Sequence, residues 1–325
     1  MIHLRIVVPR ARADDVVKLV CGSPAVTSVV HLKDVARKPD GDVVLCDVAR
    51  EDASVILSDL RELRVHEEGT IALEEIDSSV SRASVEAEKA AAGLPSDAVV
   101  WEEVQSRTSE NTELGASFLA FMAVATMIAA IGILIDSQIL IIGAMVVGPE
   151  FGPLAGLCVA LVHRRRDLSK RSLRALAVGF PVAITAAFLL TLALRATGSA
   201  PGEVTERAFT SFISHPDEFS VIVAFLAGIA GVLSLTAAKS GALIGVLISV
   251  TTIPSAANIG VAAAYGDGNE WVGAMEQLSL NLASIVAAGT LTLYIQRRLY
   301  LRRRREHMSD RARAEAGLPA RPQPR

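Results

Sequence analysis

Long apolar runs fill the chain between residues 115 and 296, and short polar segments separate them. A helix needs about 20 apolar residues to cross a hydrocarbon core that is roughly 30 Å thick. The runs predict six membrane-spanning helices, at about 115–135, 139–162, 173–194, 219–238, 241–263 and 272–296. We therefore expect an α-helical, multi-pass membrane domain over residues 114–298.

The segment before these runs has the pattern of a water-soluble α+β domain. Strand-like stretches are HLRIVV, TSVVHL, DVVLCDV and GTIAL, which begin at positions 3, 27, 42 and 69. Apolar residues recur at helical spacing over 14–20 and 51–63. The resulting order, β-α-β-β-α-β, is typical of a ferredoxin-like domain, which we place at residues 1–77 and in the cytosol.

Two further segments flank the membrane domain. Residues 78–113 predict a helical connector, in which Trp101 and neighbouring valines favour a helix along the membrane interface. Residues 299–325 predict a basic, largely disordered tail whose arginines contact anionic lipid. No nucleic-acid-binding motif accompanies these arginines, so we expect no nucleic-acid partner.

The positions of Lys and Arg predict the orientation of the spans. HRRRDLSKRS at 163–172 holds five of them, Lys239 lies in a later connection, and an Arg-rich segment follows the last span. The positive-inside rule places these loops and both termini in the cytoplasm. Because no basic segment followed by an apolar core opens the sequence, we expect no cleaved signal peptide.

The six spans divide into two groups of three with a shared pattern. Each group contains a tight helical hairpin, with Gly143 and Gly245 at equivalent points after the turn. Prolines then interrupt the second span of each group, Pro149 and Pro153 in the first and Pro254 in the second. Three spans per half predict an inverted repeat, which is typical of secondary transporters whose interrupted helices form the binding site.

Glu150 is the main candidate for function, because it lies near the middle of the second span. A charged carboxylate there costs at least about 2.5–3.5 kcal/mol. It must therefore be protonated, pair with a cation or face a water-filled cavity. Pro149 and Pro153 lack the N–H donors that would satisfy helix carbonyls, and such carbonyls are tolerated at membrane depth where they line a cavity. This combination predicts a site for a cation or a proton.

The same stretch has an alternative interpretation. Gly148, Gly152 and Gly156 are spaced by four and form a small-residue ridge, which is typical of tight helix packing. Glu150 would then be hydrogen-bonded within a packed bundle and have no further role.

Polar residues around Pro254 could complete the site. They are Ser249, Thr251, Thr252, Ser255 and Asn258. The alternative is that these hydroxyl groups bond to carbonyls of their own helix. In the last span we expect Ser279, Asn281 and Ser284 to form hydrogen bonds between helices.

The sequence carries no nucleotide-binding loop, no zinc-protease motif and no nucleophile elbow. Cys21, Cys46 and Cys158 have no metal-binding spacing, and no histidine falls inside an expected span. We therefore expect no enzymatic activity, no cofactor and no metal site.

The stretch GAMVVGPEFGPLAG at 143–156, with IGILIDSQILII before it and HRRRDL after it, resembles a bacterial membrane family known as domain of unknown function 389. The likeness covers about residues 110–300. Family members often have a Ser-Pro-Leu-type segment where this chain has Gly148-Pro-Glu150, and a double proline where this chain has only Pro254. The resemblance implies a membrane domain fused to variable cytosolic parts, in the bacterial cytoplasmic membrane, and it supplies no substrate.

We therefore expect a transporter or channel-like protein for an ion or small polar solute. The predicted site comprises Gly148, Pro149, Glu150, Gly152, Pro153, Thr251, Thr252, Pro254, Ser255 and Asn258. The ferredoxin-like domain would regulate the protein or drive homo-oligomerisation, which the glycine ridges also favour. The alternative is a non-transporting membrane sensor or scaffold that anchors and clusters the cytosolic domain.

Overall fold

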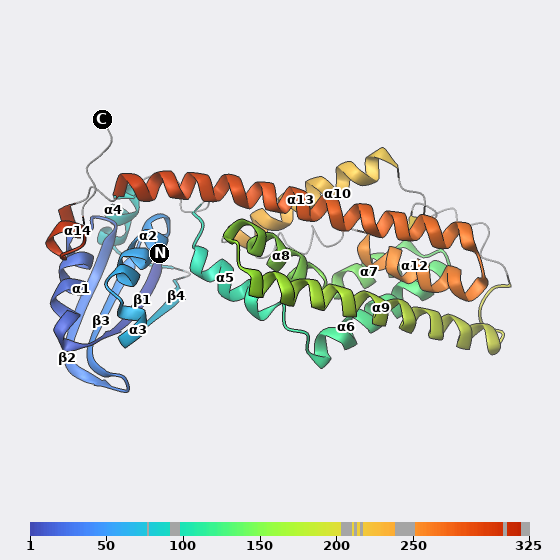
Figure 1. Ribbon diagram of the computed structural model, residues 1–325, viewed down its shortest axis with the longest axis horizontal. Helices are drawn as coiled ribbons and strands as arrows, with labels where there is room; N and C mark the ends of the chain where they lie inside the picture. The colour runs from blue at the N-terminus through green and yellow to red at the C-terminus, as the bar shows by residue number, and fades with distance from the viewer. Residues whose placement is uncertain are drawn as a thin grey trace. The chain divides into compact units, whose positions relative to one another are not determined.

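The structure is a computed structural model of the chain (Figure 1), and it describes residues 1–76, 78–91, 98–202, 210, 213–214, 217–237, 251–307 and 311–319. The chain forms two compact units. The α/β unit combines Met1–Val104 with Gln296–Arg325, and the helical unit is Gln105–Ile295. The expected break at 93–95 and the residues Lys239, Gly245 and Ser249 lie outside the described residues.

The α/β unit contains a four-stranded antiparallel sheet in the order β2-β3-β1-β4. Its elements are β1 (Ile2–Val8), α1 (Arg10–Gly22), β2 (Val26–Arg37), β3 (Asp40–Val48), α2 (Arg50–Glu62), the one-turn α3 (Val65–Glu68) and β4 (Thr70–Glu75). The predicted β-α-β-β-α-β order is confirmed, with α3 as an addition.

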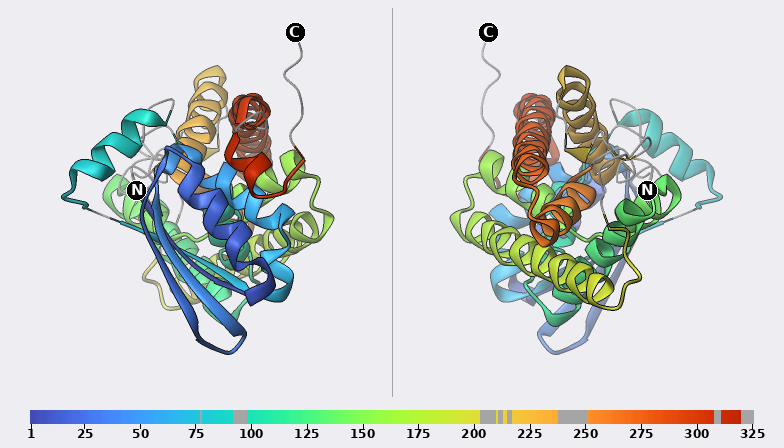
Figure 2. Two further views of the ribbon diagram at one scale, coloured as in Figure 1. Left: turned by 90° about the vertical axis from the view of Figure 1, so that its left-hand side faces the viewer. Right: turned by 90° about the vertical axis from the view of Figure 1, so that its right-hand side faces the viewer.

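Alternation along β1 explains how this sheet is covered. Ile2, Leu4, Ile6 and Val8 are buried, while the residues between them are more exposed, as a half-buried strand requires. Helices α1 and α2 bury their apolar stripes in the same core and cover one face of the sheet (Figure 2).

The C-terminal part of the chain completes this unit. Helix α14 (Arg311–Glu315) and the residues after it bury Ala312, Arg313, Ala316 and Leu318. This differs from the expected disordered tail. The physical reason is an ion pair, since Arg313 contacts Asp59 of α2.

The connector also differs from its sequence interpretation. It contains α4 (Arg82–Ala90) and α5 (Trp101–Glu110). Trp101 is 3% exposed and its ring lies 6.2 Å from that of Tyr300, in an edge-to-face arrangement within the α/β unit. The aromatic residue thus fills a protein core, where we had expected a membrane interface.

The helical unit is built from α6 (Ala116–Leu134), α7 (Gln138–Val147), α8 (Phe151–His163), α9 (Arg166–Ala196), α10 (Glu218–Thr236), α12 (Thr252–Tyr265) and the first part of α13 (Gly268–His307). Within the described residues, four helices are long and apolar enough to cross a membrane, namely α6, α9, α10 and α13. Helices α7 and α8 form a fifth candidate if the bent pair is one span. These helices fit a membrane protein.

The expected span at 241–263 is described only from Thr251 onward, where α12 begins at Thr252. All residues of α12 except Ala263 and Tyr265 are buried. It packs against α6, α7 and α9, and Gly260 permits close contact with α9, where an added Cβ would lie 2.7 Å from the carbonyl oxygen of Ile184. A short helix enclosed by other helices explains why most of this segment is apolar, and its buried polar side chains form hydrogen bonds.

Candidate functional site

The interruption between α7 and α8 is the first part of the site. Helix α7 ends before Gly148, Glu150 is the N-cap residue of α8, and the two helices are bent by 52° relative to each other. Pro149 lies in the break. Pro153 is the third residue of α8, where the missing N–H is tolerated because the first N–H groups of a helix have no partner inside it.

Glu150 lies buried at this break, with a side chain that is only 4% exposed. Its Oε1 accepts a hydrogen bond of 2.7 Å from the Thr252 hydroxyl group. Its Oε2 is buried and has no hydrogen-bond partner among the described residues. A Cβ at Gly148 would lie 2.4 Å from Oε2 and 2.6 Å from Cγ1 of Ile253, so only glycine allows this approach. The structure therefore brings Gly148, Glu150 and Thr252 together, as the sequence predicted.

The start of α12 is the second part of the site. Pro254 is the third residue of α12 and lies in its first turn. This is the position that Pro153 holds in α8. Both prolines thus lie in the first turn of a helix. Residues 238–250, which precede α12, lie outside the described residues, so the expected interruption of the span at 241–263 stays a prediction.

Two of the predicted residues of α12 have other partners. The Ser255 hydroxyl group donates to the Thr251 carbonyl oxygen at 2.6 Å, which is the local back-bonding that we considered as an alternative. The Asn258 amide donates to Glu270 of α13 at 3.2 Å. Both residues are buried, and both help to hold α12 in place.

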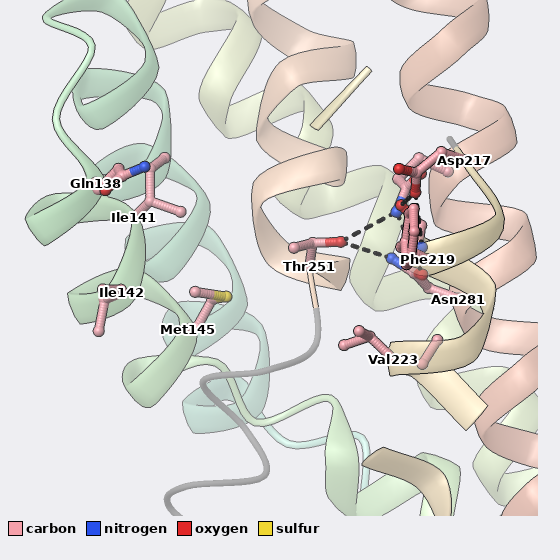
Figure 3. A pocket seen from close by; sticks show the side chains of 12 residues that line it. Gln138, Ile141, Ile142, Met145, Asp217, Phe219, Val223, Thr251 and Asn281 are labelled. Carbon is pink, nitrogen blue, oxygen red and sulfur yellow. Dashed lines mark hydrogen bonds between the residues drawn. The ribbon is translucent and has the colours of Figure 1, made fainter. Parts of the chain in front are cut away.

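Helix α13 supplies polar groups to the same turn of α12. The Asn281 amide donates to Thr251 Oγ1 at 2.8 Å, and the Gln277 amide donates to the same atom at 3.3 Å (Figure 3). Both side chains are 2% exposed. Oε1 of Gln277 has no partner among the described residues. Asn281 was among the residues expected to bond between helices and Gln277 was not, although two amides four residues apart in an apolar helix were a usable signal.

A cavity of about 430 Å³, here called the α10 cavity, opens beside Thr251 (Figure 3). Apolar side chains of α7 and α10 form much of its wall, and Figure 3 shows those of α7 facing Thr251 across it. Its polar lining residues are Gln138, Asp217, Ser220, Thr251, Gln277 and Asn281.

A second cavity of about 340 Å³, the α8 cavity, lies at the break itself. Its lining includes Gly148, Pro149, Phe151 and Gly152 from the break and Glu110, Asn111 and Glu113 from the segment before α6. Glu150 and Thr252 line neither cavity, but their chain neighbours do: Thr251 lines the α10 cavity, and Gly148 and Pro149 line the α8 cavity.

The glycine ridge also has the packing role that we considered. A Cβ at Gly152 would lie 2.8 Å from the carbonyl oxygen of Asn111, and one at Gly156 would lie 2.3 Å from Cγ2 of Thr112. The ridge therefore allows the segment before α6 to lie directly against α8. Packing and a buried carboxylate thus occur together in this stretch.

The electrostatic character of the site is acidic. Among the described residues that line either cavity there is no Lys, Arg or His, while Asp217, Glu110 and Glu113 are carboxylates. Glu150 lies at the start of α8 and is bonded by the first residue of α12, so two helix N-termini lie near it. The partial positive charge of a helix N-terminus stabilises an anionic group by typically about 0.3–1 kcal/mol. In the described part of the chain, no cluster of three or more His, Cys, Asp or Glu side chains could hold a metal ion.

Comparisons with known proteins concern this same part of the chain. Residues 145–287 match the sequence model of a family described as "Domain of unknown function (DUF389)". The uncharacterized protein MJ0678 of Methanocaldococcus jannaschii is 25% identical over 193 residues, which are 58% of this chain and 58% of that protein. The chain thus spans less than two thirds of this relative's length. No solved structure matches the chain significantly. The family match covers Glu150, α12 and Gln277, so the site lies within the segment that matches this family, as the sequence resemblance predicted.

Proposed function

We propose that this protein moves an ion or a small polar solute across a membrane, through the site between the α7–α8 break and the start of α12. One observation carries the proposal: a buried carboxylate with one oxygen atom that has no partner among the described residues lies next to residues that line two cavities. A buried polar group without a partner is costly, and a protein retains it where it serves a purpose.

The helix positions support the inverted repeat that we infer. Three helices of the first half and three of the second half begin at a constant offset of 101 or 102 positions. Helix α6 begins at Ala116 and α10 at Glu218, and α8 begins at Phe151 and α12 at Thr252. Helix α9 begins at Arg166 and α13 at Gly268. In addition, α8 and α12 both carry proline as their third residue. Six spans in two halves would relate these pairs by inversion, with the binding site where the short helices α8 and α12 begin.

The same proposal assigns roles to the remaining parts of the chain. The basic residues at 163–172 and at the Arg-rich end favour an orientation with both termini in the cytoplasm, and the family resemblance supports a bacterial cytoplasmic membrane. Arginines of that end would contact anionic lipid, although Arg303 and Arg304 also bond to Asp52 and Glu62.

The ferredoxin-like α/β unit would regulate transport or pair copies of the chain. The edge strand β2 exposes Val30, Leu32 and Val35 by 45%, 42% and 49%. An exposed apolar sheet edge favours pairing with a second copy, which supports a homo-oligomer.

The second candidate function is a membrane sensor or scaffold without transport. It is favoured by the tight packing of Gly152 and Gly156, which a static bundle would also need. The two functions differ in whether water reaches Glu150.

Cysteine accessibility distinguishes the two functions. The test uses Glu150→Cys in full-length chain with Cys21, Cys46 and Cys158 replaced by Ser, and a small membrane-impermeant thiol reagent applied from each side of the membrane in turn. The matched control is Ala129→Cys, because Ala129 is 0% exposed in the core of the helical unit. We expect labelling at position 150 and none at position 129. An unlabelled position 150, in a protein shown to be folded, would contradict transport and favour the scaffold.

A further inference from the structure

We infer that the ligand of this site is a monovalent cation, either a proton or an alkali metal ion, held by Glu150 and Gln277; this inference rests on the proposed transport function. The inference goes beyond transport as such, because it states that the transported ligand is positively charged and monovalent. Three observations carry it: the charge of the cavity linings, the unpartnered oxygen atoms and the number of buried carboxylates.

The charge of the linings selects against anions. Every ionisable residue among the described lining residues of the two cavities is a carboxylate, namely Asp217 for the α10 cavity and Glu110 and Glu113 for the α8 cavity. A cavity lined by charges of one sign concentrates ions of the opposite sign. An anion that reached Glu150 would be repelled by its carboxylate, and no basic residue among the described lining residues would offset that repulsion. Cations are therefore the ions that both entrances favour.

The unpartnered atoms supply the ligands. Thr251 and Thr252 are consecutive, and their hydroxyl groups bond to different partners, Thr252 to Glu150 and Thr251 to Gln277 and Asn281. The side chains of Glu150 and Gln277 therefore approach the same turn of α12. Each has one buried oxygen atom without a partner in the described part of the chain, Oε2 of Glu150 and Oε1 of Gln277. Carboxylate and carbonyl oxygens are ligands of hard cations, and a carboxylate oxygen is also the atom that binds a proton.

The charge count selects one positive charge. Glu150 is the one carboxylate among the described residues whose side chains form hydrogen bonds with Thr251 or Thr252. Calcium is bound by six to eight oxygen ligands, several of them carboxylates, and the described residues contain no cluster of three acidic or metal-binding side chains. A neutral solute would leave an ionised Glu150 without a compensating charge, which a buried site disfavours. One carboxylate is balanced by one monovalent cation.

Flux into proteoliposomes tests the inference with the full-length chain. Three arms follow proton uptake with a trapped pH indicator, radioactive Na⁺ uptake and radioactive Rb⁺ uptake as a substitute for K⁺. N-methyl-D-glucamine chloride replaces the metal salts as the blank. We expect uptake in the proton arm or in an alkali metal arm, and the arm that responds identifies the ion. Glu150→Gln should reduce that uptake at least about tenfold, because it removes the charge that balances the ion.

Two further variants make the test specific. Thr252→Val removes the hydrogen bond to Glu150 with little change in volume, so it should raise the ion concentration for half-maximal uptake by about tenfold while the protein stays folded. Glu218→Gln is the control, because Glu218 is an exposed carboxylate in the first turn of α10. Ion uptake by this variant should equal that of the wild type. Uptake that is the same in wild type, Glu150→Gln and Thr252→Val would overturn the inference.

The outcome also separates this inference from the transport proposal. If position 150 is labelled through water but none of the three cations is taken up, the cation assignment is wrong and transport of another solute stands. If position 150 is neither labelled nor needed for uptake, both are wrong.

Discussion

The ion pair between Arg313 and Asp59 provides the sharpest stability prediction. Both side chains are 1% exposed, and Asp59 also accepts a hydrogen bond of 2.9 Å from Nε2 of His307. Arg313 also contacts Glu62 at 2.8 Å, whose side chain is 30% exposed. Asp59→Leu removes the buried acid and leaves the arginine with a partner that is partly in water. We expect α14 to detach from α2 more easily in this variant.

The magnitude follows from the burial of both partners. Breaking a buried pair by removing one member costs about 3–5 kcal/mol. Because Glu62 still holds Arg313, we expect the lower end, about 3 kcal/mol, which corresponds to roughly a 100-fold change in a local opening equilibrium. Replacing both members with apolar residues, Asp59→Leu with Arg313→Met, should recover most of this loss because no unpaired charge stays buried.

Hydrogen–deuterium exchange of the full-length chain measures the effect in peptides that cover residues 311–319. We expect exchange to become roughly 100-fold faster in Asp59→Leu and to return toward the wild type in the double variant. Glu86→Ala is the control, since it breaks an exposed pair with Arg82 that is worth less than about 1 kcal/mol. Unchanged exchange in Asp59→Leu, or faster exchange in the double variant than in the single one, would refute the reasoning.

Three further predictions concern other parts of the chain. Gly148→Ala should lower the thermal unfolding midpoint and ion uptake, at a cost of about 1–3 kcal/mol, whereas Gly143→Ala should change neither because nothing lies within 4 Å of its added Cβ. Burial raises the pKa of Glu51, whose two oxygens have no partner in another described residue, so charging it destabilises the fold. Glu51→Gln should therefore raise the unfolding midpoint at pH 7, and the gain should vanish below about pH 4, where this group is protonated in the folded and unfolded states alike. Burial also raises the pKa of the Cys46 thiol to about 12, so a maleimide should label the exposed Cys21 and leave Cys46 unmodified in the native protein.

Three results would contradict these predictions. They are equal unfolding midpoints for the two glycine variants, a gain from Glu51→Gln that persists at pH 3, and labelling of Cys46 before unfolding. Mass spectrometry of tryptic peptides reports the last of these directly.

Local sequence patterns predicted the parts of the fold that local physics determines. Alternation in β1 and helical spacing in α1 and α2 were enough for the order of the α/β unit, and a lone carboxylate in an apolar run was enough to single out Glu150. The partners of Glu150 were only partly predictable. The spacing of Gln277 and Asn281 marks a polar face of α13, but which helix this face meets depends on tertiary packing and could not be predicted from α13 itself.

The C-terminal part of the chain was mispredicted for a related reason. Arginine and alanine near a chain end are typical of a solvated tail, and sequence alone gave no sign that Arg313 would meet Asp59, 254 positions earlier. The place of Pro254 within its helix was not predictable, because a proline in the first turn of a helix and a proline inside a helix look the same in an apolar run.

The assignment of Gln296–Arg325 to the same unit as Met1–Val104 has a consequence for biosynthesis. A ribosome releases Asp59 long before Arg313 has been made, and the whole helical unit must be synthesised in between. Until then Asp59 lacks its partner Arg313, and the core of the α/β unit lacks Ala316 and Leu318. A nascent chain, or one that terminates before Arg313, thus exposes apolar surface that a chain with α14 buries. Chaperones and proteases that bind exposed apolar surface can therefore distinguish the two.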